Sequence, residues 1–209
     1  MNAPVDRAEL ADYRRRVSEL YAEVRRAATR AAEAASPFRR GRDQLFADHP
    51  QSPLRGEAKA AFDGITYYPY DPSLRLSLPL DPDLETTSVE IELGADGVVR
   101  LERVARVRFT LAGEPLELTV FWIGGYGGGL FLPFGDATNG DETYGGGRYL
   151  LDTIKGADLG GDGSYLNVDF NYAYNPSCAY DARWTCPLAP PENRLHVAVR
   201  AGERHVDSP

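Results

Sequence analysis

The residues best suited to chemistry are concentrated in the segment 131–195, which is rich in Asn, Asp, Tyr, Arg and Trp and contains both cysteines. A β-domain can fold with less, so this density predicts an organised polar site or a tightly tied loop region. Asp169 and Glu192 are candidate general bases, and Cys178 is a candidate nucleophile. The candidate ligand-binding residues are Tyr144, Arg148, Asn171 and Asn175.

Arg148 follows three consecutive glycines, 145–147. Glycines allow close approach of the backbone to a ligand or a neighbouring strand, and arginine can bind a carboxylate or phosphate through two hydrogen bonds. The alternative is a structural ion pair that pins the loop, with Asp136, Asp152 or Asp169 as the partner. We predict that Arg148 and Asp169 lie close together, either as a direct ion pair or on opposite sides of one ligand.

Asp169 belongs to an alternating polar row on one predicted strand. The row comprises Tyr165, Asn167, Asp169 and Asn171. Side chains two residues apart point to the same face of a strand, so these four groups face either solvent or a cavity. The following Asn175-Pro176 is a turn signal whose Asn can bond local backbone.

Cys178 and Cys186 lie eight positions apart in a loop rich in proline and aromatic residues. Three alternatives stay open: buried structural thiols, a disulfide that rigidifies the loop, or a catalytic or redox-active thiol. A nucleophilic thiol needs a neighbouring base, and the chain has only His49, His196 and His205. His196 is predicted to point away from the core, and His49 would have to approach through folding.

Metal and cofactor signatures are missing from the sequence. Asp136, Asp141 and Glu142 suggest a cation loop, but their spacing does not match an EF-hand. No phosphate-binding GxxxxGK[ST] sequence occurs, and the glycines from Gly125 to Gly129 lack the strand–helix context of a dinucleotide site. We therefore predict no metal site and no cofactor.

The N-terminal part of the chain is predicted to be helical. Apolar residues recur at spacings of three and four from Leu10 to Val24, which predicts a helix over 7–35 that ends at Ser36-Pro37. Shorter helices are predicted at 38–48 and 56–62. Arginines on the long helix favour an ordinary solvated face or a homodimer contact over membrane binding, because acidic residues are interspersed.

Beyond Gly64 the apolar residues alternate with polar ones, as in half-buried antiparallel strands. The clearest sets lie at 106–111, 116–122, 165–171 and 195–199, and Asp96-Gly97 and Ala112-Gly113 are hairpin-turn signals. We predict a mainly β fold with N-terminal helices: an antiparallel β-sandwich or barrel of about eight strands. The predicted divisions are a helical segment at 1–63, a β-domain at 64–203 and a flexible tail at 204–209.

Charge and hydropathy restrict the partners. The net charge is −8, with ten Arg against seven acidic residues in 1–46 and 13 basic against 24 acidic residues in the remainder. An acidic bulk argues against nucleic acid, and no apolar run reaches membrane-spanning length. The first residues lack the apolar core of a secretory signal, so we expect a cytoplasmic protein with no membrane partner.

Several long motifs resemble a bacterial family catalogued as a domain of unknown function. They are HPQSPL at 49–54, YPYDP at 68–72, GDATNGDETYGGGRYLLD at 135–152, and DFNYAYNPSCAY and CPLAPPENRL at 169–180 and 186–195. The resemblance extends over about 40–203, and CPLAPP replaces the more usual CPLPPP. It implies domain boundaries but no catalytic residues.

Two functions follow as hypotheses. The first is a small-molecule site, either for binding or for acid–base catalysis, formed by the loops at 134–148 and 169–194. The second is a non-catalytic interaction module that uses the long N-terminal helix, in which the same polar residues are scaffolding.

Overall fold

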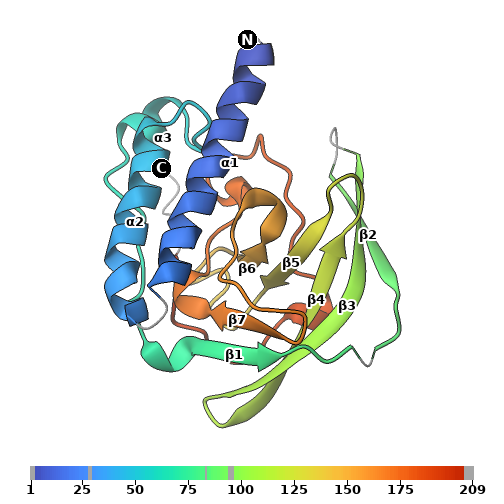
Figure 1. Cartoon of the computed structure of the whole chain (residues 1–209). Coiled ribbons are helices and arrows are strands. Elements are labelled where there is room, and N and C mark those ends of the chain that lie inside the picture. Colours follow the sequence, from blue (N-terminus) through green and yellow to red (C-terminus); the bar gives the residue numbers. More distant parts are fainter. Residues whose placement is uncertain (1–2, 28–29, 83, 94–96, 205–209) are drawn as a thin grey trace.

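The computed structural model describes residues 3–27, 30–82, 84–93 and 97–204. Two antiparallel sheets pack against each other, and the N-terminal helices lie side by side along one side of them (Figure 1). The helices are α1 (Ala3–Arg26), α2 (Ala31–Asp48) and α3 (Gly56–Ala60). The strands are β1 (Arg75–Pro79), β2 (Ser88–Glu92), β3 (Val98–Leu111), β4 (Glu114–Ile123), β5 (Gly129–Phe134), β6 (Arg148–Asp152) and β7 (Tyr165–Asp169).

The alternating segments form the sheets. One sheet has the strand order β2-β3-β4-β5-β6, and β1 pairs with β7 in the other. The apolar positions of β3 and β4 face each other across the ladder, with Val107 opposite Leu118. They pack against Leu78, Val168 and Phe170 from the side of the small sheet. The prediction of a mainly β, sandwich-like fold with N-terminal helices is confirmed, with seven strands among the described residues.

The predicted hairpin turn at Ala112-Gly113 is confirmed. Both residues have positive φ, 53° and 84°, as a two-residue turn between twisted strands requires. The second turn signal includes Asp96, which lies outside the described residues.

The predicted helix boundary at Pro37 is wrong, because Pro37 lies inside α2 and the chain leaves α1 after Arg26. Tertiary packing explains the difference. Phe38 contacts the ring of Tyr21 on α1 edge to face, and α1 and α2 bury their apolar faces in one cluster with Tyr172. This burial outweighs the lost hydrogen bond at one proline.

The predicted last strand, at 195–199, is also wrong, since no strand forms there. The backbone of this segment bonds only briefly to a neighbouring segment, from Leu195 N–H to the Gly135 carbonyl and from Ala137 N–H to the Val197 carbonyl, and at Val199 buried side chains take over. Asp136 accepts from the Val199 amide, and Arg148 donates to the Val199 carbonyl at 2.9 Å. Within the described ranges, no helix has both the length and the apolarity to span a bilayer.

Candidate functional site

A chamber of about 350 Å³ lies where α1 and α2 meet the large sheet and the loop at 174–187. Helix α1 contributes Tyr13, Arg14 and Tyr21 to its lining, and the sheet side contributes Val99 and Ile123. The chamber forms because the apolar face of α1 covers the end of β6 without filling the space beside it. Its size lies at the lower end of the range of small-molecule sites.

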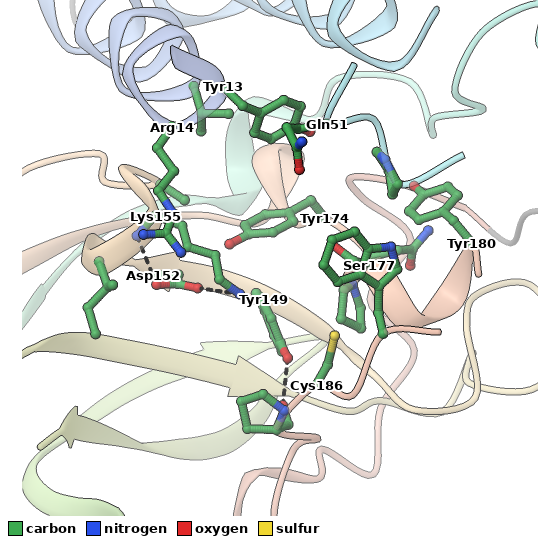
Figure 2. A pocket seen from close by; sticks show the side chains of 18 of the residues that line it. Tyr13, Arg14, Gln51, Tyr149, Asp152, Lys155, Tyr174, Ser177, Tyr180 and Cys186 are labelled. Atoms are coloured by element: carbon green, nitrogen blue, oxygen red, sulfur yellow. Dashed lines mark hydrogen bonds and ion pairs between the residues drawn. The ribbon is translucent and has the colours of Figure 1, made fainter. Parts of the chain in front are cut away.

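Aromatic rings from distant parts of the chain form much of the lining. Figure 2 shows Tyr174 above Tyr149, Tyr180 on the opposite side of the view, and the sulfur of Cys186 directed into the chamber. The rings of Tyr149 and Tyr174 meet edge to face with centroids 5.6 Å apart. The Tyr149 hydroxyl donates to the Pro187 carbonyl at 2.6 Å, which ties β6 to the loop. The aromatic walls are therefore held in place by their own contacts.

A buried ion pair supports one side of the chamber. Arg42 of α2 donates from Nε to Glu203 at 2.9 Å, and both side chains are almost fully buried. Glu203 also accepts from the Asn175 amide at 2.7 Å and from the Tyr180 hydroxyl at 2.8 Å. Burial raises the pKa of Tyr180 well above its ordinary value, and the Glu203 carboxylate adds to this shift. Tyr180 is therefore a neutral donor here.

A second charged group lies on the chamber wall near α1. Asp152, at the end of β6, has a side chain only 2% exposed, and its carboxylate pairs with Lys155 Nζ at 3.5 Å. The same carboxylate accepts from the Lys155 amide at 3.2 Å, which caps a short 3₁₀ turn. Arg14 reaches from α1 toward this pair (Figure 2).

Three residues that line the chamber each carry a buried polar atom without a hydrogen-bond partner. These atoms are the Tyr21 hydroxyl, Asn175 Oδ1 and Trp184 Nε1. The side-chain nitrogen Nδ2 of Asn175 donates to the Arg204 carbonyl at 2.9 Å, and this bond fixes the orientation of the side-chain oxygen Oδ1. A buried polar atom without a partner is unfavourable by about 1–3 kcal/mol, so this group of three is incomplete without a ligand or water.

The structure brings three of the chemically notable residues together near the chamber. Cys178 and Cys186 are free thiols, and the Tyr144 hydroxyl donates to Cys178 Sγ at 3.6 Å. The Cys178 S–H stabilises the Cys186 thiolate, and this interaction lowers the pKa of Cys186 and raises that of Cys178. Of the three alternatives for these cysteines, the structure contains thiols without a disulfide. Neither cysteine is fully buried.

Arg148 is a structural residue rather than a wall of the chamber. Its side chain is fully buried, and it donates to Asp136 at 2.8 Å and to the carbonyls of Val199, Ala201 and Glu203. This is the loop-pinning alternative, with Asp136 as the partner. The predicted direct ion pair between Arg148 and Asp169 is wrong, because Asp136 and three backbone carbonyls take the donors of Arg148 and Asp169 is bonded by Asn171 and Tyr70.

Asp169 and Asn171 lie together in a different place, beside a separate hollow of about 250 Å³ that Asp169 lines. Asp169 accepts from Asn171 Nδ2 at 2.8 Å and from the Tyr70 hydroxyl at 3.1 Å. Burial raises its pKa, and hydrogen bonds from these two residues oppose the shift. Asp169 and Asn171 are both buried, so this end of the predicted polar row does not face solvent.

Glu192 is exposed and pairs with Arg103 at 2.9 Å, away from the chamber lining. The seven expected site residues are thus divided among four places, and Asn175 alone lines the chamber. The chamber residues Tyr21, Asp152 and Lys155 were not among the expected site residues. Lys155 is one of only two lysines, which was a usable signal, whereas Asp152 was considered only as a partner of Arg148 and nothing local marks Tyr21.

Metal ligation has no counterpart among the residues that the structure describes, where no group of three or more His, Cys, Asp or Glu side chains is suited to hold an ion. The chemistry available in the chamber is therefore aromatic and aliphatic contact, a few unpaired hydrogen-bonding atoms, cationic groups near Asp152, and a thiol.

Comparison with known proteins gives relatives but no activity. The chain is similar to the solution NMR structure of an uncharacterized protein from Haloarcula marismortui, with 35% identity and a TM-score of 0.57. The match covers 81% of this chain and 91% of the other. No curated protein matches. The family model described as protein of unknown function (DUF1684) matches residues 60–204. The chain therefore belongs to the DUF1684 family.

Proposed function

We propose that this protein binds a small, largely apolar organic molecule in the chamber. The observation that supports this most directly is a set of three unpaired polar atoms, which belong to Tyr21, Asn175 and Trp184, three residues that line one cavity. Protein interiors pair almost all buried polar groups, so an unpaired set around one space indicates a missing partner. A ligand with both a donor and an acceptor would complete the set.

The surroundings favour an organic ligand over a water-filled gap. The lining is mostly apolar, and the tyrosine and tryptophan rings offer flat surfaces for an aromatic or aliphatic body. The rings are held by contacts to one another and to backbone, so little ordering is needed on binding. Asp169 and Glu192, the expected bases, do not line this space, so the proposal is binding and does not include acid–base catalysis.

The test uses a neutral fluorescent probe, N-phenyl-1-naphthylamine, titrated into the intact protein. We expect saturable binding, and we expect Ser177→Trp to weaken it at least tenfold, because the indole would occupy the chamber from the loop side. Ser88→Trp is the matched control, since Ser88 is exposed on β2. Circular dichroism checks that both variants fold. Equal binding by both variants, or no saturable binding by the native protein, would contradict the proposal.

A further inference from the structure

The chamber has an excess of cationic side chains in a protein of net charge −8. Arg14, Arg42 and Lys155 line it, against the single carboxylate of Asp152. Arg42 is neutralised by Glu203, which is fully buried behind it. The remaining three side chains, two cationic and one anionic, leave one positive charge near the end of β6.

Arg14 differs from the two arginines that follow it. Arg15 and Arg16 both bond to Asp12, at 2.8 Å and 2.7 Å, on the exposed face of α1. Arg14 makes no hydrogen bond or ion pair within the described part of the chain, and it lines the chamber. Lys155 is only partly engaged, because its side chain is 49% exposed and its contact with Asp152 is a long 3.5 Å. Donors on both side chains are available to a ligand.

Resting on the proposed function, we propose that the ligand is an organic monoanion, with an aromatic or aliphatic body in the aromatic part of the chamber and one anionic group at Arg14 and Lys155. Figure 2 shows Arg14 extending toward Lys155 and Asp152 at one end of the view. A carboxylate or sulfonate there would make charge-assisted hydrogen bonds to two side chains that both reach solvent, so its attraction should respond to salt. A single negative charge also balances the local excess.

Two probes with the same aromatic body, one anionic and one neutral, show how much the anionic group contributes to affinity. They are 1-anilinonaphthalene-8-sulfonate, an anion, and the neutral N-phenyl-1-naphthylamine. We expect the anionic probe to bind the intact protein at least tenfold more tightly. Its affinity should fall as salt is added, and that of the neutral probe should change little.

Substitutions locate the anionic group. Arg14→Gln should weaken binding of the anionic probe about fivefold to tenfold and leave the neutral probe unchanged. Arg15→Gln removes the same charge from the neighbouring position outside the chamber, so it should alter neither affinity. Asp152→Asn should strengthen anionic binding, because it removes the competing carboxylate while an amide oxygen still caps the turn. Lys155→Met should resemble Arg14→Gln.

The outcomes distinguish the two proposals. If the neutral probe binds as tightly as the anionic one and Arg14→Gln affects both equally, the monoanion inference is wrong and the proposed binding function stands. Equal effects of Arg14→Gln and Arg15→Gln on the anionic probe would also overturn the inference, because they would indicate a general charge effect. If neither probe binds, both proposals fail. Should Lys155→Met not fold, the Arg14 and Asp152 variants still decide.

Discussion

Removal of the Tyr21 hydroxyl should stabilise the ligand-free protein. The Tyr21 side chain is 0% exposed, its hydroxyl has no partner, and its ring packs edge to face on Phe38 with centroids 5.0 Å apart. Tyr21→Phe keeps the ring and this contact. It removes a polar group whose unsatisfied burial is unfavourable by about 1–3 kcal/mol. We expect the free energy of unfolding to rise by about 1 kcal/mol. This is the lower end of that range, because a small void replaces the oxygen.

Tyr172→Phe is the matched control in the same apolar cluster. The Tyr172 hydroxyl donates to the Ala31 carbonyl at 3.3 Å, so its loss should destabilise the protein by about 0.5–1.5 kcal/mol. The two substitutions make the same chemical change and are expected to have opposite signs. Urea unfolding measures both free energies, and each kcal/mol corresponds to about 2–4 °C in melting temperature for a domain of this size.

The result that would refute this reasoning is a loss of stability in Tyr21→Phe similar to that in Tyr172→Phe. It would mean that the Tyr21 hydroxyl is satisfied in the ligand-free protein, for example by ordered water. The group of unpaired atoms would then no longer indicate a ligand, and the main support for the proposed function would be lost.

Two further predictions concern the other buried groups. Asp136→Ala should destabilise the protein by about 3–5 kcal/mol because it leaves the Arg148 guanidinium buried without its counter-charge, and combining it with Arg148→Met should cost less than the sum of the single changes. Urea unfolding of the three variants measures this, and strict additivity would show that the pair is not coupled. Alkylation of Cys186 by iodoacetamide should begin at lower pH than for an ordinary thiol, and Cys178→Ala should move the profile to higher pH because the stabilising S–H is lost. An unchanged profile, followed by mass spectrometry, would contradict the assigned interaction.

The scaffold was more predictable than the site because its signal is local. The alternation at 106–111 and 116–122 gives the faces of β3 and β4 directly, and their apolar positions face each other in the structure. The alternation at 195–199 is just as regular but forms no strand, because its backbone pairing with 135–137 is limited to Leu195 and Val197 and ends at Val199, where Arg148 and Asp136 take the bonds. Local pattern shows which residues are buried, and it does not show which group takes each backbone hydrogen bond.

The chamber depends on contacts that no local pattern records. Tyr21, Asp152 and Trp184 come from three distant segments, and they share a cavity only because α1 packs beside the end of β6. Arg148 was expected to bind a ligand, and structural pairing with Asp136, which the structure contains, was among the stated alternatives. Choosing between a structural and a ligand-binding arginine required knowing whether the space beside it was filled.

The segment 199–203 supplies hydrogen-bond acceptors to both buried arginines, Arg42 and Arg148, and it is among the last parts of the chain to be synthesised. Arg148 is bonded by the carbonyls of Val199, Ala201 and Glu203, and Arg42 by the Glu203 carboxylate. α2 and the large sheet leave the ribosome before this segment. Until this segment emerges, Arg42 lacks its counter-charge and Arg148 lacks three of its acceptors. The packing around α2 and around β6 therefore stays incomplete. We therefore expect released chains truncated before residue 199 to be far more sensitive to protease than released chains that include residues 199–204.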